Sequence, residues 1–167
     1  MGLYELAQAL EASAFGSYLR ETPNWFPFLT WTHILGLLLA GGTIVFWDLR
    51  LLGRGLKTVP LKQLGSSLLP FTWVGCSILL ISGSLLFTLE AGRLYLNVPF
   101  RIKVVCLLLA VANVLFFHYR VYRSAAHWQQ QTITPVAARM AGAFSLTLWF
   151  IILAAGRAVG YTLHYGA

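Results

Sequence analysis

Residues 26–47 read FPFLTWTHILGLLLAGGTIVFW, and this stretch decides the fold. The hydrocarbon core of a bilayer is about 30 Å thick, so a helix that crosses it needs about 20 apolar residues. The stretch has that length and carries one ionisable side chain, His33, before the chain reaches Asp48 and Arg50. The sequence therefore predicts a membrane-spanning helix over about residues 26–50.

Three further apolar runs predict spans over about residues 67–90, 100–122 and 136–163. Only 10% of the residues are charged, whereas soluble domains carry about 25%, so lipid must surround much of the chain. Residues 3–20 place apolar side chains at helical spacing between polar ones, which is typical of an amphipathic helix in the membrane interface. We expect residues 1–167 to form one transmembrane domain.

The predicted fold class is an all-α membrane protein, an up-down bundle of four transmembrane helices that follows an N-terminal interfacial amphipathic helix. Short loops between long helices favour this topology. The interfacial helix is interpreted as a structural anchor, and a lid over an outer-face site is the alternative. The first apolar run begins too late for a cleavable signal peptide and lacks a small-residue cleavage site, so the chain is expected to stay intact.

The net charge of +7 would suggest a nucleic-acid partner in a soluble protein, but here the basic residues flank the predicted spans, so no such partner is expected. The positive-inside rule counts basic residues in the loops at the membrane ends. It places the loops after the first and third spans in the cytoplasm and both termini in the periplasm. Seven of the twelve basic residues fall on the cytoplasmic side, namely Arg50, Arg54, Lys57, Lys62, Arg120, Arg123 and Arg139, and five on the other, namely Arg20, Arg93, Arg101, Lys103 and Arg157.

His33 is the main candidate functional residue. A charged side chain at the middle of a membrane helix costs roughly 2.5–3.5 kcal/mol on insertion scales, so ionisable residues there are functional candidates. His33 shares a helix face with the small residues Gly36 and Ala40, which predicts that its imidazole points into the bundle. His118 lies near the cytoplasmic end of the third span, whereas His127 and His164 are expected at the headgroups or in water.

Inward histidines in a helical bundle are typical ligands of haem b, so His33 and His118 are candidate cofactor and metal ligands. His33 lies in the outer half of its span and His118 in the inner half, so the two are not expected to hold one iron. Met140 lies at about the depth of His118, and Arg157 is a candidate partner for a haem propionate or for Glu90.

Besides a haem with only one protein ligand, two alternatives stay open for the histidines. A copper ion held by soft ligands is one, with Cys106 as a neighbour of His33. A structural histidine that hydrogen-bonds across helices is the other. Cys76 and Cys106 are otherwise interpreted as small packing residues inside the spans.

Four other polar residues fall in or beside the spans. Asp48 is expected either to pair with Arg50, Arg120 or Arg123 or to serve as a proton-transfer carboxylate or as one wall of a quinone site. Asn113 is expected to donate a hydrogen bond between helices. Lys103 and Arg101 are expected to extend outward to the headgroups.

The chain resembles a family of uncharacterised bacterial four-helix inner-membrane proteins, a domain of unknown function. The resemblance covers the first three spans and, more weakly, the fourth. It places the protein in the bacterial inner membrane and implies no established reaction. The matching pieces are Thr32–Gly36, Trp47–Gly53 (WDLRLLG), Ser82-Gly83, Asn97–Lys103, Asn113 with His118, and Gly156-Arg157. More distantly the chain is similar to membrane b-type cytochromes and to the copper-resistance D group, which also place histidines in short-loop bundles.

Three hypotheses for function follow. The first is a small b-type cytochrome-like electron-transfer protein that passes electrons between a periplasmic redox protein and quinone. The second is a non-redox assembly subunit or small transporter whose histidines are structural or move protons, and the third is a copper-handling protein. Lipid is the expected environment in each case, with a homo-oligomer or a larger complex as an open alternative. Hydrolysis is not expected, because the sequence offers no nucleophile–base constellation.

Overall fold

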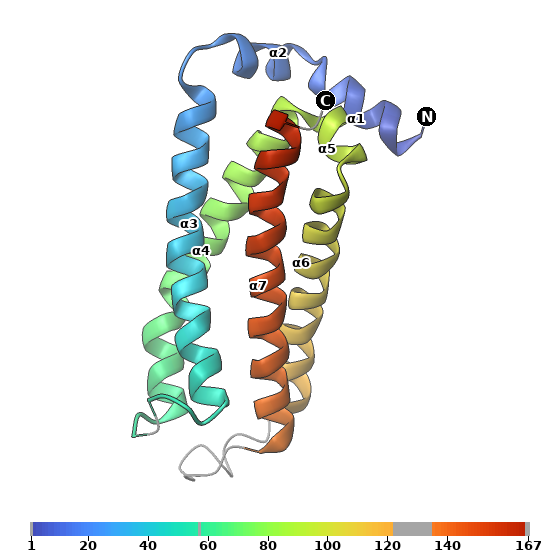
Figure 1. Ribbon diagram of the computed structural model, residues 1–167. Coiled ribbons are helices and arrows are strands. Elements are labelled where there is room, and N and C mark those ends of the chain that lie inside the picture. Colours follow the sequence, from blue (N-terminus) through green and yellow to red (C-terminus); the bar gives the residue numbers. More distant parts are fainter. Residues whose placement is uncertain (1, 57, 122–134, 166–167) are drawn as a thin grey trace.

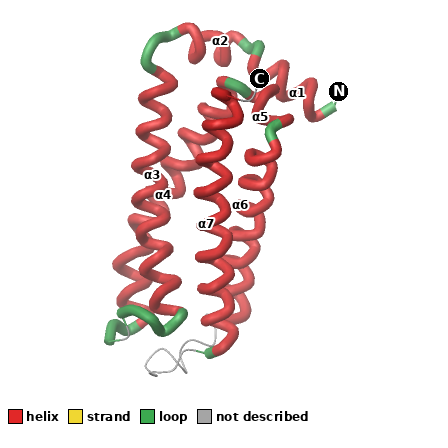
Figure 2. Tube along the Cα trace, viewed as in Figure 1, coloured by secondary structure: helices red, strands yellow, loops and turns green. Residues whose placement is uncertain are grey.

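Four long helices dominate the computed structural model, which describes residues 2–56, 58–121 and 135–165. They are α3 (Trp25–Leu51), α4 (Leu61–Leu89), α6 (Val98–Phe116) and α7 (Val136–Tyr165). Each of the four is long and apolar enough to cross a membrane, with the third counted through Arg120. They run alternately up and down, and no strand occurs in the described ranges (Figures 1 and 2). The predicted fold class is confirmed.

Two short helices, not one, precede the first span. They are α1 (Leu3–Glu11) and α2 (Ala14–Glu21), and the chain turns between them because the Ser13 hydroxyl caps α2 by accepting a hydrogen bond from Gly16 N at 3.1 Å. They lie across the end of the bundle where both termini are found (Figure 1), which we call the outer end.

A helix that the sequence did not predict, α5 (Ala91–Leu96), lies in the connection between α4 and α6. It packs against α1. One Glu11 carboxylate oxygen accepts a hydrogen bond from Gly92 N at 2.8 Å, and the other forms an ion pair with Arg20 at 3.2 Å. Arg20 also donates to the Leu89 carbonyl at 3.3 Å. These bonds tie the N-terminal helices to the bundle.

Close backbone contact holds α3 against α4. A Cβ atom on residue 75 would lie 2.5 Å from Ala40 N, and one on residue 36 would lie 2.8 Å from Ile78 Cγ2. Real Cβ atoms do not approach so closely, so Gly36 and Gly75 are what permit this spacing. Small residues at helix crossings serve the same purpose in many membrane proteins.

The bundle consists of two helix pairs rather than a closed square. Helices α3 and α4 form one pair, α6 and α7 form the other, and the contact of α3 with α7 joins them. Between α4 and α6 the described residues make no comparable backbone contact, although the rings of Phe87 and Phe100 stack at 5.5 Å. The second and third spans, α4 and α6, are therefore consecutive in the sequence but do not form a helix pair.

Two span boundaries differ from the prediction. Helix α4 begins at Leu61, six residues before the predicted start at 67, because Leu61 and Leu64 are buried and extend the packed face. Helix α6 continues into a π-helical turn, η1 (Phe117–Val121). The loop that was expected to carry Arg123 and His127 lies outside the described residues.

Candidate functional site

The half-buried imidazole of His33 lies between α3 and α4. Its Nδ1 is 2.9 Å from the hydroxyl oxygen of Ser82, which is only 1% exposed. A Cβ on residue 83 would lie 3.2 Å from His33 Cε1, so Gly83 lets the ring approach the backbone of α4. The predicted inward orientation of His33 is therefore correct.

The bonds of Ser82 assign the proton on the neutral His33 ring. A serine hydroxyl has one hydrogen to donate and two lone pairs that accept. Ser82 Oγ donates that hydrogen to the carbonyl of Ile78 at 2.6 Å. It must then accept from His33, so the ring carries its hydrogen on Nδ1 and the lone pair on Nε2. The arrangement leaves Nε2 able to bind a metal or to accept a hydrogen bond.

Lys103 faces the same part of the bundle from α6. Its Nζ lies 3.8 Å from the place that a Cβ would take on Gly156 of α7. The expectation that Lys103 extends outward is wrong. It belongs to the stripe of α6 that packs on α7, together with Cys106, Ala110 and Asn113. The helical spacing of these four residues was the signal in the sequence that could have predicted the inward direction of Lys103.

Helix rise places these groups in one layer of the bundle. At 1.5 Å per residue, His33 lies about 12 Å from the start of α3 and Lys103 about 8 Å from the start of α6. Ser82 lies about 10 Å from the outer end of α4. Together with Gly83 and Gly156, these residues form what we call the outer-layer site.

His118 and Met140 lie far from this layer. His118 is about 30 Å from the start of α6, so about 18 Å separates it in depth from His33. Its side chain is exposed on the π-helical turn, and Met140 is 66% exposed near the start of α7. The structure does not bring either residue to the outer-layer site. Within the described ranges, no three His, Cys, Asp or Glu side chains are grouped to hold a metal ion.

Arg157 does not pair with Glu90, which was one of its two predicted partners. Its guanidinium donates to the Tyr161 hydroxyl at 2.8 Å and lies 4.3 Å from the centre of that ring. Glu90 forms an ion pair with Arg93 at 2.9 Å instead. Arg157 is exposed, although it lies at about the depth of the outer-layer site, about 12 Å from the end of α7.

Of the remaining polar residues, Asn113 behaves as predicted, whereas Asp48 does not pair with Arg50. Asn113 donates a hydrogen bond to the Ala141 carbonyl of α7 at 3.1 Å, as expected. Asp48 does not pair with Arg50, which donates to the Val59 carbonyl at 3.1 Å. The Asp48 side chain is buried between α3 and α7, near Ser145.

Both cysteines are free. Cys106 is buried against Leu148 and Ile152 of α7, in agreement with the packing role expected for it. No contact that the structure defines joins it to His33.

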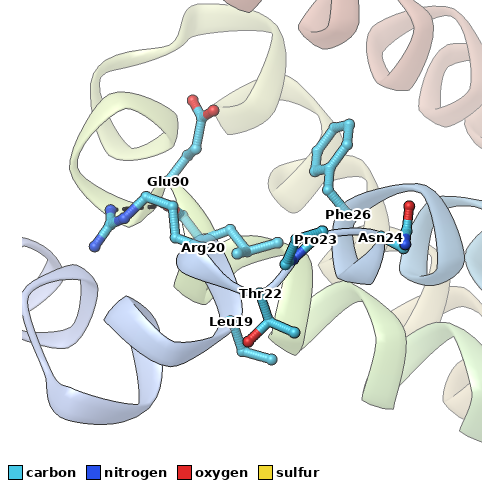
Figure 3. Close-up of a pocket in the computed structure, with 8 residues that line it drawn as sticks. Leu19, Arg20, Thr22, Pro23, Asn24, Phe26 and Glu90 are labelled. Atoms are coloured by element: carbon cyan, nitrogen blue, oxygen red, sulfur yellow. Dashed lines mark hydrogen bonds between the residues drawn. The ribbon is translucent and has the colours of Figure 1, made fainter.

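A shallow hollow of about 250 Å³ opens at the outer end, under the junction of α2 and α3. Figure 3 shows Pro23, Asn24 and Phe26 on one side of it and Glu90 on the other. Arg20 lines it but is already bonded to Glu11 and to backbone carbonyls. The hollow is smaller than typical ligand pockets of about 300–1,000 Å³, so it adds no second candidate site.

These features define a small all-α membrane protein with polar groups from different helices in contact across its interior. The chain belongs to a family of unknown function (DUF6644), whose model matches residues 12–162. No curated protein and no solved structure matches the chain.

Proposed function

We propose that this membrane protein transfers electrons through a haem b that His33 holds by its Nε2 atom. The observation that carries the proposal is the bond of His33 Nδ1 to Ser82, whose own hydrogen is committed to the Ile78 carbonyl. Histidines that bind metals almost always donate their other ring N–H to a fixed acceptor, which sets the tautomer and the ring orientation. His33 meets that requirement without any rearrangement.

The surroundings of His33 support the same proposal. Gly83 and Gly156 carry no side chain where α4 and α7 face the layer, so the His33 ring packs directly against α4 and Lys103 Nζ comes close to α7. Lys103 extends toward the layer and would form a charge-assisted bond with a propionate. Arg157 is the second candidate for a propionate because it lies at about the same depth.

The haem of this proposal has one protein ligand from the described part of this chain, because His118 and Met140 lie at the other end. The sixth position of the iron is then open to a small exogenous ligand. The proposal therefore differs from the usual arrangement of membrane electron carriers, in which two side chains at equal depth hold one iron.

The partners follow from the location of the site. The outer-layer site lies near the end that the distribution of basic residues places in the periplasm. We propose that the protein works in the bacterial inner membrane, with both termini periplasmic, and passes electrons between a periplasmic redox protein and quinone.

Optical spectroscopy tests the proposal. The protein, expressed with added haem precursor and purified in detergent, should show a Soret band that shifts when dithionite reduces it and again when carbon monoxide binds. His33→Ala should abolish the band, and Ser82→Ala should weaken haem binding about tenfold, as loss of such supporting bonds does. His164→Ala is the matched control and should keep the wild-type spectrum, with circular dichroism to check folding.

Two results would overturn this assignment. A wild-type protein without any Soret band excludes the cytochrome, and an unchanged band in His33→Ala excludes His33 as the ligand. Elemental analysis of the same samples tests the copper alternative directly.

A structural role for His33 is the second candidate, and the same bond to Ser82 favours it. Side-chain bonds between membrane helices are worth about 0.6 kcal/mol on average. A haem-free protein in which His33→Ala and Ser82→Ala lower stability equally would support the structural role and a non-redox assembly or transport function.

A further inference from the structure

Asp48 is the one acidic side chain among the described residues that is fully enclosed, with 3% of its surface exposed. It lies four residues before the C-cap of α3, at the end of the bundle away from the termini. Helix α7 covers it closely, since a Cβ on Gly142 would lie 3.1 Å from the Asp48 carbonyl oxygen. Side chains at this end pack into a cluster that includes Leu51 and Phe117.

One carboxylate oxygen, Oδ2, is buried without a hydrogen-bond partner in the described part of the chain. The Ser145 side chain of α7 lies near the carboxyl group and is the hydrogen-bond donor that we infer for it. A buried carboxylate oxygen without a hydrogen bond or counter-charge is costly, and each such atom in a native structure calls for an explanation.

Within the described ranges, no ion pair joins a cationic side chain to Asp48. Arg50, on the same helix, donates to Val59. Lys62 of α4, Arg139 of α7, and His118 and Arg120 of η1 are exposed, and none of the ion pairs that the structure defines includes Asp48.

A metal cation fits the surroundings poorly. Hard cations such as Mg²⁺ and Ca²⁺ need about six oxygen ligands or more. The side chains here supply the two carboxylate oxygens and one serine hydroxyl, and the packing of Gly142 on the Asp48 backbone leaves little room for water. A proton needs one oxygen and no added volume.

We propose that Asp48 and Ser145 form a proton-binding site between α3 and α7. Uptake adds a proton from the inner aqueous phase to the carboxylate and gives a neutral carboxylic acid, and release returns that proton and leaves the carboxylate bonded to Ser145. No electron moves in this exchange. The site is independent of the haem proposal, since it uses other residues at the other end of the bundle.

Asp48 is the single aspartate in the sequence, so the site can be observed without mutation. The full chain, labelled with carboxyl-¹³C aspartate and placed in phosphatidylcholine vesicles, gives an infrared carbonyl signal from Asp48 alone. We expect a carboxylic-acid band that converts reversibly to a carboxylate band as pH rises. Ser145→Ala removes the bond that stabilises the charged form and should lower the carboxylate fraction at a given pH. The matched control is Ser77→Ala, an exposed serine on α4, which should leave the titration unchanged.

Three outcomes would overturn the proposal. A carboxylate band at every pH at which the protein stays folded means that no proton binds. An acid band that never converts means that no proton is exchanged. A band that responds to added sodium or potassium at constant pH assigns the site to a metal cation.

Discussion

Asn113 illustrates what a single polar side chain does inside a bundle that lipid surrounds. Its amide reaches across the helix pair to the Ala141 carbonyl at 3.1 Å. Thr72 and Thr43 make a similar link between α4 and α3 at 2.8 Å. Lipid chains are as apolar as leucine, so apolar contacts distinguish poorly between one helix register and another. Hydrogen bonds such as these define the register instead.

Replacing Asn113 with leucine should therefore weaken the α6–α7 pair. We expect a loss of about 0.6 kcal/mol in the free energy of unfolding, within a range that reaches about 1.7 kcal/mol. Reversible unfolding in lipid bicelles measures it. Thr147→Val is the control, because Thr147 is exposed and bonds only the Ala143 carbonyl of its own helix. Equal stability of the two variants would mean that the Asn113 bond contributes nothing.

Residue positions were predicted better than residue partners. The depth of His33 and its inward direction followed from the small residues on its helix face. Ser82 as its partner did not, because the pairing depends on how α3 meets α4. The direction of Lys103 was missed because a lysine near the end of a membrane helix is expected to extend to the headgroups, and that expectation ignored its helical spacing with Cys106, Ala110 and Asn113.

At the scale of whole helices, the spans were predictable because the bilayer sets their length. No comparable rule fixes the short helices at the outer end. The division of residues 3–20 into α1 and α2 depends on the Ser13 cap, and α5 depends on packing against α1 and on the bond from Gly92 N to Glu11. The bond from Gly92 N to Glu11 joins residues that are far apart in the sequence, so local patterns gave no sign of it, whereas the Ser13 cap is a local signal that the sequence analysis missed.

The crossing of α3 and α4 gives a test at this scale. In Gly75→Ala the new methyl group would meet Ala40 N at 2.5 Å, so the helices must separate. We expect a loss of about 1–3 kcal/mol in the free energy of unfolding, as for other overpacked contacts. Gly41→Ala is the matched control, since its Cβ meets nothing within 4 Å and alanine favours the helix. A Gly75→Ala protein as stable as the Gly41→Ala protein would contradict this crossing geometry.

The molecule as a whole has two chemically different ends. The outer end carries both termini, the N-terminal helices and the ion pairs Arg20–Glu11 and Arg93–Glu90. The inner end carries exposed cationic side chains, among them Arg54, Lys62 and Arg139, and its one acidic residue, Asp48, is buried. The positive-inside rule predicts that the end with more basic residues lies in the cytoplasm.

This asymmetry predicts how the whole molecule lies in the membrane. In a background without Cys76 and Cys106, a cysteine at residue 21 should react with a membrane-impermeant maleimide added to intact cells. A cysteine at residue 55 should react only after the membrane is opened. Both positions lie outside the four spans, at the end of α2 and in the loop after α3, and the exposed Glu21 makes no side-chain bond that the structure defines. The reverse labelling pattern would place the basic end outside. It would also put the outer-layer site on the cytoplasmic side and remove the argument for a periplasmic electron partner, while the assignment of His33 as a ligand would be unaffected.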